Sequence, residues 1–189
     1  MYTDVSICAK ALVKLGIPPI TSFNEPRAEA EVARELYPTV RDGLLAAYPW
    51  SFTIAQADLQ QDPNAQPADF RYAYLLPADL LRTISAGTGG RGRGLIFRIR
   101  GDRLVTDSPS VTLTYQKRVP ESQFPPFFVN ALIARLAAEF AIPLTEATSR
   151  AEALQRLAAA EFRLARILDS QQATPLRVED FTLIEARRS

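Results

Sequence analysis

The chain has no histidine, and this absence excludes more chemistry than any other feature of its composition. Without an imidazole there is no Ser-His-Asp triad, no Cys-His pair and no histidine-bound metal. A carboxylate pair, a lysine base or a Mg²⁺ ion held by carboxylates would remain. The absence of histidine therefore makes an enzyme a less favoured class of function.

Three further absences narrow the class of protein. The single cysteine, Cys8, excludes an internal disulfide, cysteine-rich zinc sites and iron–sulfur clusters. No apolar run approaches the ~20 residues that span a bilayer, and the first residues lack the pattern of a signal peptide, so we predict no membrane partner. The formal net charge of +1 gives no bulk attraction to nucleic acid.

The residues that are present are typical of a globular domain, because 47% of the 189 are hydrophobic and 23% are charged. The most apolar stretch is 124–143, in which Phe128, Leu132 and Leu136 follow one helical row. A helix that is apolar around most of its girth is packed on several sides, so we predict that this is the core helix. Pro143 is predicted to end it.

Two helices are predicted before the core helix. Residues 3–15 show helical periodicity, with Thr3 as a plausible N-cap and Gly16 placed to close the helix. A longer helix is predicted from about residue 24 to residue 48, and Pro38 inside it is predicted to kink or split it.

A last helix is predicted after the core helix. Ser149 and Glu152 have the spacing of a capping box, which indicates where the helix begins, and its pattern fades near Asp169. The apolar residues expected on its buried side are Leu154, Leu157, Ala158, Phe162, Ala165 and Leu168.

Between the second helix and the core helix, the pattern changes to the two-residue alternation of β-strands. Gly101-Asp102 suits a tight hairpin turn, so residues 70–119 are predicted to form a small antiparallel unit. Trp50, just before this region, is predicted to be buried under the helix end.

The sequence therefore predicts an α+β fold, a helical bundle with a small antiparallel β subdomain inserted between the second and third helices. We assign residues 1–55 and 120–170 to the helical bundle domain and residues 56–119 to the inserted β subdomain. Residues 171–189 are assigned to an extended C-terminal docking tail.

The glycine-rich stretch 87–94 is the first candidate site, since Arg91 and Arg93 lie among glycines that could cradle a phosphate. It lacks the ending of a P-loop and joins two strands instead of opening a helix, which disfavours nucleotide binding. We interpret it as a loop that contacts a neighbouring subunit, a tail protein or a DNA channel. Arg98 and Arg100 of the next strand are added to this surface, although a solvated sheet face is the simpler interpretation of these two arginines.

A carboxylate cluster of Asp58, Asp62 and Asp69 is the second candidate. The three residues lie in or beside a proline-containing loop that fixes no geometry, so solvation explains them better than catalysis.

A family resemblance follows from several stretches taken in order. They are Leu15-Gly16 with Pro19-Ile20-Thr21-Ser22, Val40-Arg41-Asp42-Gly43-Leu44-Leu45, Tyr48-Pro49-Trp50-Ser51-Phe52, residues 71–79, residues 99–107 and residues 115–144. Each stretch is weak alone, but together their order and spacing resemble the phage head-to-tail adaptor proteins. This family is also called tail tubular protein A or gatekeeper-like, and it includes adaptors of gene transfer agents.

The resemblance implies a structural protein of a virion or phage-like particle, made in the host cytoplasm and located in the neck. It implies no catalysis, which agrees with the absent histidines, so we expect a protein that is not an enzyme, with no catalytic residue, no metal site and no cofactor. It implies a ring of twelve subunits that binds the portal protein and a downstream tail or nozzle protein. DNA would pass through the lumen without sequence-specific binding.

In related adaptors the C-terminal segment makes the portal or subunit contacts, and the C-terminal tail of this chain has a composition that fits such a role. Its apolar anchors are expected to be Val178, Phe181, Leu183 and Ile184. Its polar edge is expected to consist of Arg177, Arg187 and Arg188. A tail that folds back on its own domain is the alternative.

Two other classes of function compete with the adaptor. One is a small enzyme that uses carboxylates, which turnover abolished by Asp or Glu replacement would support. The other is a non-viral helical interaction module without ring assembly, which subunit stoichiometry separates from the adaptor.

Overall fold

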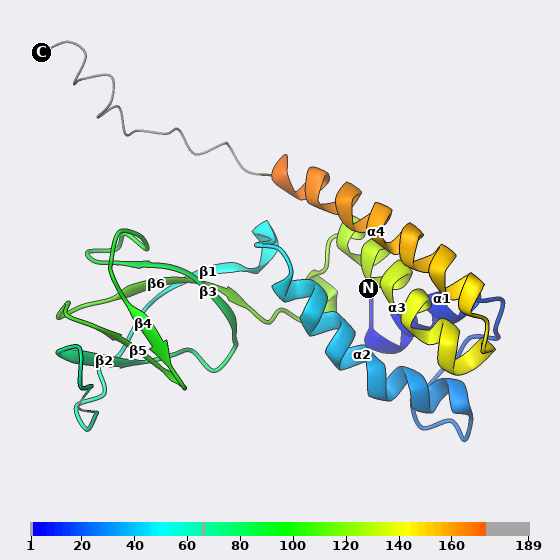
Figure 1. Cartoon of the computed structure of the whole chain (residues 1–189), viewed down its shortest axis with the longest axis horizontal. Helices are drawn as coiled ribbons and strands as arrows, with labels where there is room; N and C mark the ends of the chain where they lie inside the picture. Colours follow the sequence, from blue (N-terminus) through cyan, green and yellow to red (C-terminus); the bar gives the residue numbers. More distant parts are fainter. Residues whose placement is uncertain (1, 66, 173–189) are drawn as a thin grey trace, which may run out of the picture.

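The computed structural model of the chain describes residues 2–65 and 67–172. It contains four helices and two small antiparallel sheets, and the sheets lie between the second and third helices in sequence. This is the α+β fold predicted from the sequence. Figure 1 shows the helices gathered at one end of the molecule and the sheets at the other.

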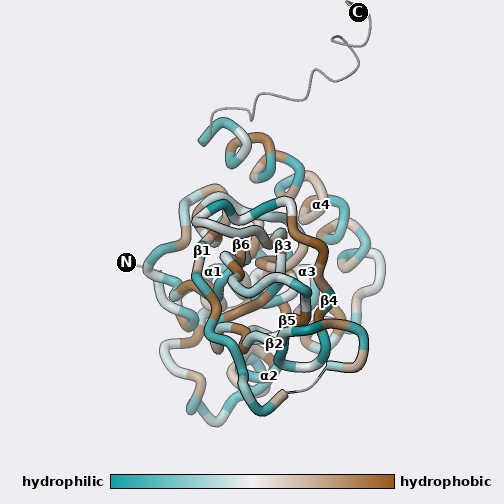
Figure 2. The backbone as a smooth tube through the Cα atoms, turned by 90° about the vertical axis from the view of Figure 1, so that its left-hand side faces the viewer, coloured by the Kyte–Doolittle hydropathy of each residue, from teal (hydrophilic) through white to brown (hydrophobic). Residues whose placement is uncertain are grey.

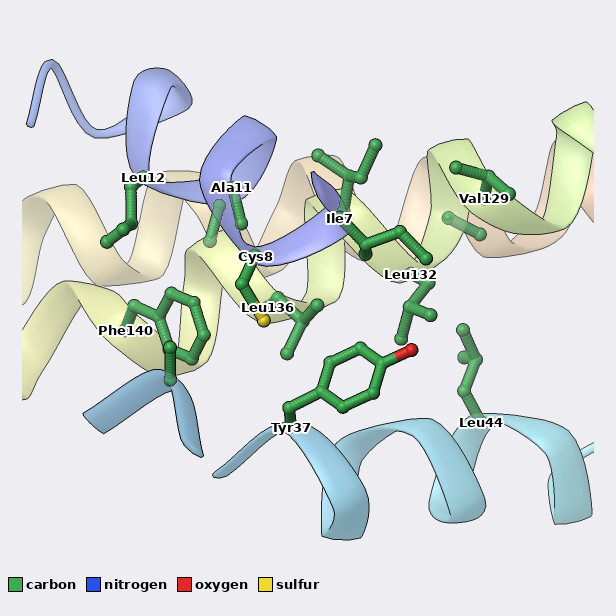
Figure 3. Close-up of a cluster of buried hydrophobic side chains, with 14 of the residues drawn as sticks. Ile7, Cys8, Ala11, Leu12, Tyr37, Leu44, Val129, Leu132, Leu136 and Phe140 are labelled. Atoms are coloured by element: carbon green, nitrogen blue, oxygen red, sulfur yellow. The ribbon is translucent and has the colours of Figure 1, made fainter. Parts of the chain in front are cut away.

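The core helix is α3 (Pro126–Thr145), and the other three helices pack around it. They are α1 (Asp4–Lys14), α2 (Ala28–Ala46) and α4 (Thr148–Ser170). Eleven of the 20 residues of α3 are buried. Figure 3 shows Leu132, Leu136 and Phe140 of α3 facing Ile7 and Cys8 of α1 and Tyr37 of α2. The predicted core helix is therefore confirmed.

The prediction that no apolar stretch approaches the length of a bilayer span needs correction, because α3, alone among the helices of the described residues, is long and apolar enough to cross one. Its apolar surface is used inside the bundle, against α1, α2 and α4. Hydrophobic burial of about 25 cal/mol per Å² makes this packing the main stabilising contribution to the helical end of the molecule.

Both ends of α1 follow the prediction. The hydroxyl of Thr3 accepts a hydrogen bond from the Ser6 N–H at 3.2 Å, and the Ser6 hydroxyl accepts one from the Thr3 N–H at 2.9 Å. Gly16 follows the helix with φ of +68°, a conformation that favours glycine.

Two proline predictions need correction. Helix α2 is not split at Pro38, which is exposed, and runs unbroken from Ala28 to Ala46. Helix α3 does not end at Pro143 but continues to Thr145. The turn around Pro143 is held by other donors, because the Glu146 N–H bonds to the Ile142 carbonyl at 3.0 Å and the Thr145 hydroxyl bonds to the Ala141 carbonyl at 2.6 Å.

The predicted capping box of α4 is wrong. The helix begins at Thr148, and its N-cap residue, Ala147, makes no side-chain capping bond. Glu146 has φ of +53°, so the chain reverses within two residues of α3 and enters α4 before reaching Ser149. The short connection, not the capping motif, sets the start of the helix.

The predicted antiparallel β region is confirmed and consists of two sheets of three strands each. One sheet has the order β1–β6–β3 and the other the order β2–β5–β4, and every pairing is antiparallel. The strands are β1 (Ile54–Asp58), β2 (Tyr72–Leu75), β3 (Leu80–Gly87), β4 (Arg98–Arg100), β5 (Arg103–Thr106) and β6 (Thr112–Lys117). Figure 2 looks onto this end, with both sheets in front of the helices. The predicted hairpin turn at Gly101 is confirmed, with φ of +59°.

The sheets are joined to the bundle by side chains that cap the end of α2. The last carbonyls of a helix have no donor within the helix. Here Trp50 Nε1 donates to the Leu44 carbonyl at 2.9 Å, and Gln116 Nε2 of β6 donates to the carbonyls of Leu45 and Tyr48 at 3.1 and 2.7 Å. The β region therefore completes a helix of the bundle.

Candidate interaction surfaces

The glycine-rich stretch is a loop that packs onto the first sheet. The hydroxyls of Ser85 and Thr114 both donate to the carbonyl of Gly92, which is buried. A Cβ at Gly92 would collide with the Thr114 hydroxyl, and a Cβ at Gly87 would collide with the Arg91 carbonyl. Close backbone packing thus explains two of the glycines, and no phosphate site is needed to explain them.

Arg91 and Arg93 are both exposed on this loop. Neither forms an ion pair with any of residues 2–65 or 67–172. Their guanidinium groups are therefore free, within the described chain, to meet an acidic partner.

Arg98 and Arg100 lie on β4, an edge strand of the second sheet, and all three residues of β4 are exposed. Both arginines reach the carboxylate of Asp69, and Arg98 also lies over the ring of Phe70, 5.9 Å from its centroid. The structure brings these two arginines together, on a different sheet from the one that the glycine-rich loop covers.

The structure separates the three carboxylates that the sequence suggested as a cluster. Asp58 accepts a hydrogen bond from the Thr112 hydroxyl at 2.6 Å, Asp62 pairs with Arg103 at 2.9 Å, and Asp69 pairs with Arg100. The hydrogen bond from Arg103 is the main reason that the pKa of Asp62 is lowered. In residues 2–65 and 67–172, no group of three or more candidate metal ligands gathers.

The predicted contact residues of the C-terminal tail lie outside the described residues. They are Arg177, Val178, Phe181, Leu183, Ile184, Arg187 and Arg188. The tail contact stays a prediction.

The stretch 48–52, which carries part of the family resemblance, is the structural centre of the molecule. Trp50 is fully buried, as predicted, and contacts five aromatic rings at centroid distances of 5.0–6.3 Å. Beside it, the backbone N–H of Ser51 donates to Asp169 of α4 at 3.0 Å and the hydroxyl of Ser51 donates to it at 2.7 Å. The bundle, the sheets and the end of α4 therefore meet at this stretch.

A charged network lies beside this junction. Arg41 of α2 donates to Glu121 at 3.0 Å, Tyr37 donates to the same carboxylate at 3.0 Å, and Arg118 pairs with Asp42 at 2.6 Å. Burial alone would raise the pKa of Glu121. Hydrogen bonds from its own backbone, Arg41 and Tyr37 outweigh the burial and lower that pKa.

Sequence reasoning missed an apolar surface on α4, which we name the α4 ridge. Leu157 and Leu168, predicted to be buried, are 42% and 37% exposed. Leu164 and Ile167 are 51% and 57% exposed and complete the ridge. The residues of α4 that are buried are Ala151, Ala158, Ala165 and Asp169. Leu157, Leu164 and Leu168 are seven and four residues apart and share one face of the helix, on which Glu161 also lies. The periodicity could be read from the sequence, but the face that it marks is an outer one.

A groove lies between α2 and α4, and we name it the α2–α4 groove. Its volume is about 590 Å³, and its floor is formed by Arg135 and Glu139 of α3, which pair at 2.7 Å as predicted. The rest of its lining comes from α2 and α4 and consists of Leu36, Thr39, Val40, Gly43, Leu44, Ala47, Ala158, Ala159 and Phe162.

No protein-family model matches this sequence, and comparison with curated proteins gives no match.

Proposed function

We propose that the protein is a structural head-to-tail adaptor of a tailed phage or phage-like particle. In this role it forms a ring beneath the portal, continues the DNA channel and offers its sheets to the next tail component. The observation that carries the proposal is the position of the resembling stretches. Residues 48–52 join the bundle to the sheets. Residues 71–79 and 99–107 contain β2, β5 and two of the three residues of β4, and these strands pair in one sheet.

This arrangement supports the proposal because the resembling stretches lie together in the structure. They form the junction between the bundle and the sheets and most of one sheet. The exposed arginines of the glycine-rich loop, Arg91 and Arg93, add a second point. The loop between β3 and β4 that carries them belongs to the sheet end of the molecule (Figure 1), where we place the contact with a tail protein.

The test is the particle mass of the full chain, alone and mixed with purified portal rings, measured by mass photometry. We expect the portal mass to increase by about twelve subunits, the number that the family resemblance implies. A chain that ignores every portal ring offered, including the one encoded beside it in its genome, would overturn the adaptor function.

A helical interaction module without a ring is the second candidate function. The α4 ridge favours it as much as it favours an adaptor, because a row of exposed apolar side chains marks a protein contact of either kind. A defined one-to-one complex with another protein, and no ring with or without the portal, would support this alternative.

A further inference from the structure

The outer edge of β1 is an unpaired sheet edge. Figure 2 shows the strands of the first sheet in the order β1, β6, β3, so β6 pairs with β1 along one side only. The Leu59 N–H donates to the Val111 carbonyl at 2.9 Å, and the direction of backbone groups alternates along an antiparallel strand. The N–H and C=O groups of Gln56 and Asp58 therefore point away from β6. No hydrogen bond reaches these four groups from elsewhere in the described chain.

The other three edges of the two sheets are protected in ways that β1 is not. The backbones of Gln60 and Asp62 hydrogen bond to the outer side of β2. Strand β3 has two register irregularities and accepts a backbone hydrogen bond from Leu95 at its end, and β4 has only three residues, two of them arginines. Such devices keep an edge from pairing with another chain. Strand β1 has five residues, no proline, no basic side chain and no register irregularity, so its edge is open to a further strand.

Two arginines flank the loop residue that packs beside β1. A Cβ at Gly92 would lie 2.8 Å from the side-chain nitrogen of Gln56. Its chain neighbours, Arg91 and Arg93, are exposed and form no ion pair within the described chain. The one acidic side chain of β1, Asp58, already accepts a hydrogen bond from a hydroxyl of β6. A strand at this edge is therefore favoured when it brings carboxylates to the two arginines.

The same charges disfavour a second copy of this chain as the partner. Two copies joined antiparallel through β1 would be related by a two-fold axis perpendicular to the sheet, so both glycine-rich loops would lie on one face. Arg91 and Arg93 of both copies would then lie on the same face, with only the two Asp58 carboxylates to oppose them. A different chain that supplies acidic side chains avoids this repulsion.

We propose that the free edge of β1 binds an extended, acidic segment of another protein. The segment adds to the first sheet as a fourth strand, hydrogen bonded to the backbones of Gln56 and Asp58. Its carboxylates lie against Arg91 and Arg93. The proposal deepens the adaptor function and rests on it for the identity of the partner, which is then the next tail component.

The test measures the binding of fluorescent peptides to the full chain by fluorescence anisotropy. The probe is a peptide of about eight residues that alternates threonine and glutamate and is long enough to span the edge. One control peptide has lysine in place of glutamate, which reverses its charge. A second control peptide is the acidic probe with N-methyl groups along its backbone, which keeps the charge and removes the N–H donors.

Two sets of variants separate strand addition from attraction of charge. Gln56→Pro removes the outward N–H and leaves the pairing with β6, because proline is tolerated where an edge N–H faces away from the sheet. Gln56→Ala is its control, since it loses the same side chain and keeps the N–H. The pair Arg91→Glu and Arg93→Glu reverses the charge beside β1. The pair Arg156→Glu and Arg163→Glu, at exposed positions of α4, is its control because the net charge changes equally. Circular dichroism checks the fold of each variant.

We expect the acidic peptide to bind the native chain, and the lysine and N-methylated peptides to bind at least roughly 10-fold more weakly. Gln56→Pro and the double reversal at Arg91 and Arg93 should each weaken binding of the acidic peptide at least roughly 10-fold. The two control variants should leave its affinity unchanged.

Four results would overturn the proposal. The first is an acidic peptide that does not bind up to its solubility limit. The second is binding that Gln56→Pro and N-methylation leave intact, because it would show attraction of charge without strand addition. The third is self-association that Gln56→Pro abolishes, because a second copy would then occupy the edge. The fourth is binding that requires truncation after Gln172, because residues 173–189 of the same chain would then be the occupant.

The particle-mass measurement with portal rings separates this proposal from the adaptor function. A chain that joins the portal and ignores the acidic peptide would leave the adaptor function standing and refute the β1 contact. A chain that binds the acidic peptide and ignores every portal ring would keep the β1 contact and assign it to a partner other than a tail protein.

Discussion

At the scale of single residues, the glycines of this chain play different parts that the sequence does not distinguish. Gly92 is buried under Thr114 and Gln56, whereas Gly43 faces open space. The sequence alone explains neither glycine. Only the atoms around each Cβ position show that Gly92 is required by close packing and that Gly43 is not.

Gly92→Ala is expected to destabilise the fold by about 1–3 kcal/mol, because its methyl group must displace Thr114 or move the loop away from the sheet. Gly43→Ala is the control and should stabilise the free subunit by about 0.5–1 kcal/mol through helix propensity. Urea unfolding measures both changes. Equal effects of the two substitutions would contradict the packing of the loop described here.

Cys8 is expected to be unreactive in the folded protein. Burial, with a smaller contribution from Asp4, raises the pKa of its thiol to about 12, so the thiolate that reacts with disulfide reagents is almost absent at neutral pH. Because the folded pKa lies above the unfolded value of 9.0, this group stabilises the fold fully below about pH 9 and progressively less as the pH rises toward 12.

The measurement is the rate of reaction with a chromogenic disulfide at about pH 8, in buffer and in urea. As the only cysteine, Cys8 gives the whole signal. We expect slow reaction in buffer and rapid reaction in urea, and fast stoichiometric labelling of the folded chain would refute the burial of this thiol.

At the scale of elements, the sequence predicted the features that depend on local periodicity. It missed the helix ends and exposed faces that depend on neighbouring segments. The apolar row of α3 and the cap at Thr3 are local patterns, and both were confirmed. The prediction that α3 ends at Pro143 was wrong because two hydrogen-bond donors after Pro143 hold the last turn. The prediction that Ser149 caps α4 was wrong because the two-residue connection makes the helix begin earlier, at Thr148.

The burial of helix faces was also only partly predictable from the sequence. The apolar residues of α4 were recognised, but their assignment to the inside was wrong for Leu157 and Leu168, since alanines fill the inner face next to α3. Helical periodicity shows that residues share one face of a helix, but it does not show whether that face is buried. The groove could not be predicted at all, because it depends on the spacing of three helices.

The attachment of α4 to the junction rests on Asp169, which is buried and accepts three hydrogen bonds from Ser51. Asp169→Ala is expected to destabilise the protein by about 2–3 kcal/mol, because the Ser51 N–H would be left without a partner. A double-mutant cycle with Ser51→Ala, measured by urea unfolding, isolates the contribution of the hydroxyl. Strictly additive effects would mean that the Ser51 hydroxyl and Asp169 do not act together.

At the scale of the whole molecule, the bundle and the sheets share polar groups at their boundary. Gln116 belongs to β6, yet its amide satisfies carbonyls at the end of α2. Arg118 follows β6 and pairs with Asp42 of α2. The two ends of the molecule are therefore expected to unfold as one cooperative unit.

Gln116→Leu tests this coupling. Leucine fills about the same volume but leaves the buried Leu45 carbonyl without its side-chain donor, whereas the Tyr48 carbonyl keeps the Trp50 backbone N–H at 2.8 Å. We therefore expect a loss of about 1–3 kcal/mol. Trp50, the only tryptophan, reports on the junction by fluorescence, and far-UV circular dichroism reports on the whole chain. The two unfolding curves should coincide in the native chain and separate in the variant. If the two unfolding curves coincide in the variant as well as in the native chain, Gln116 does not couple the sheets to the bundle.

The hydrogen bonds between Asp169 and Ser51 also determine how a mechanical pull is transmitted through the molecule. Asp169 lies in the last turn of α4, and Ser51 begins the short turn that leads into β1. A pull on the C-terminal end of α4 therefore reaches Ser51 through these hydrogen bonds, and it acts on the first sheet as well as on the bundle.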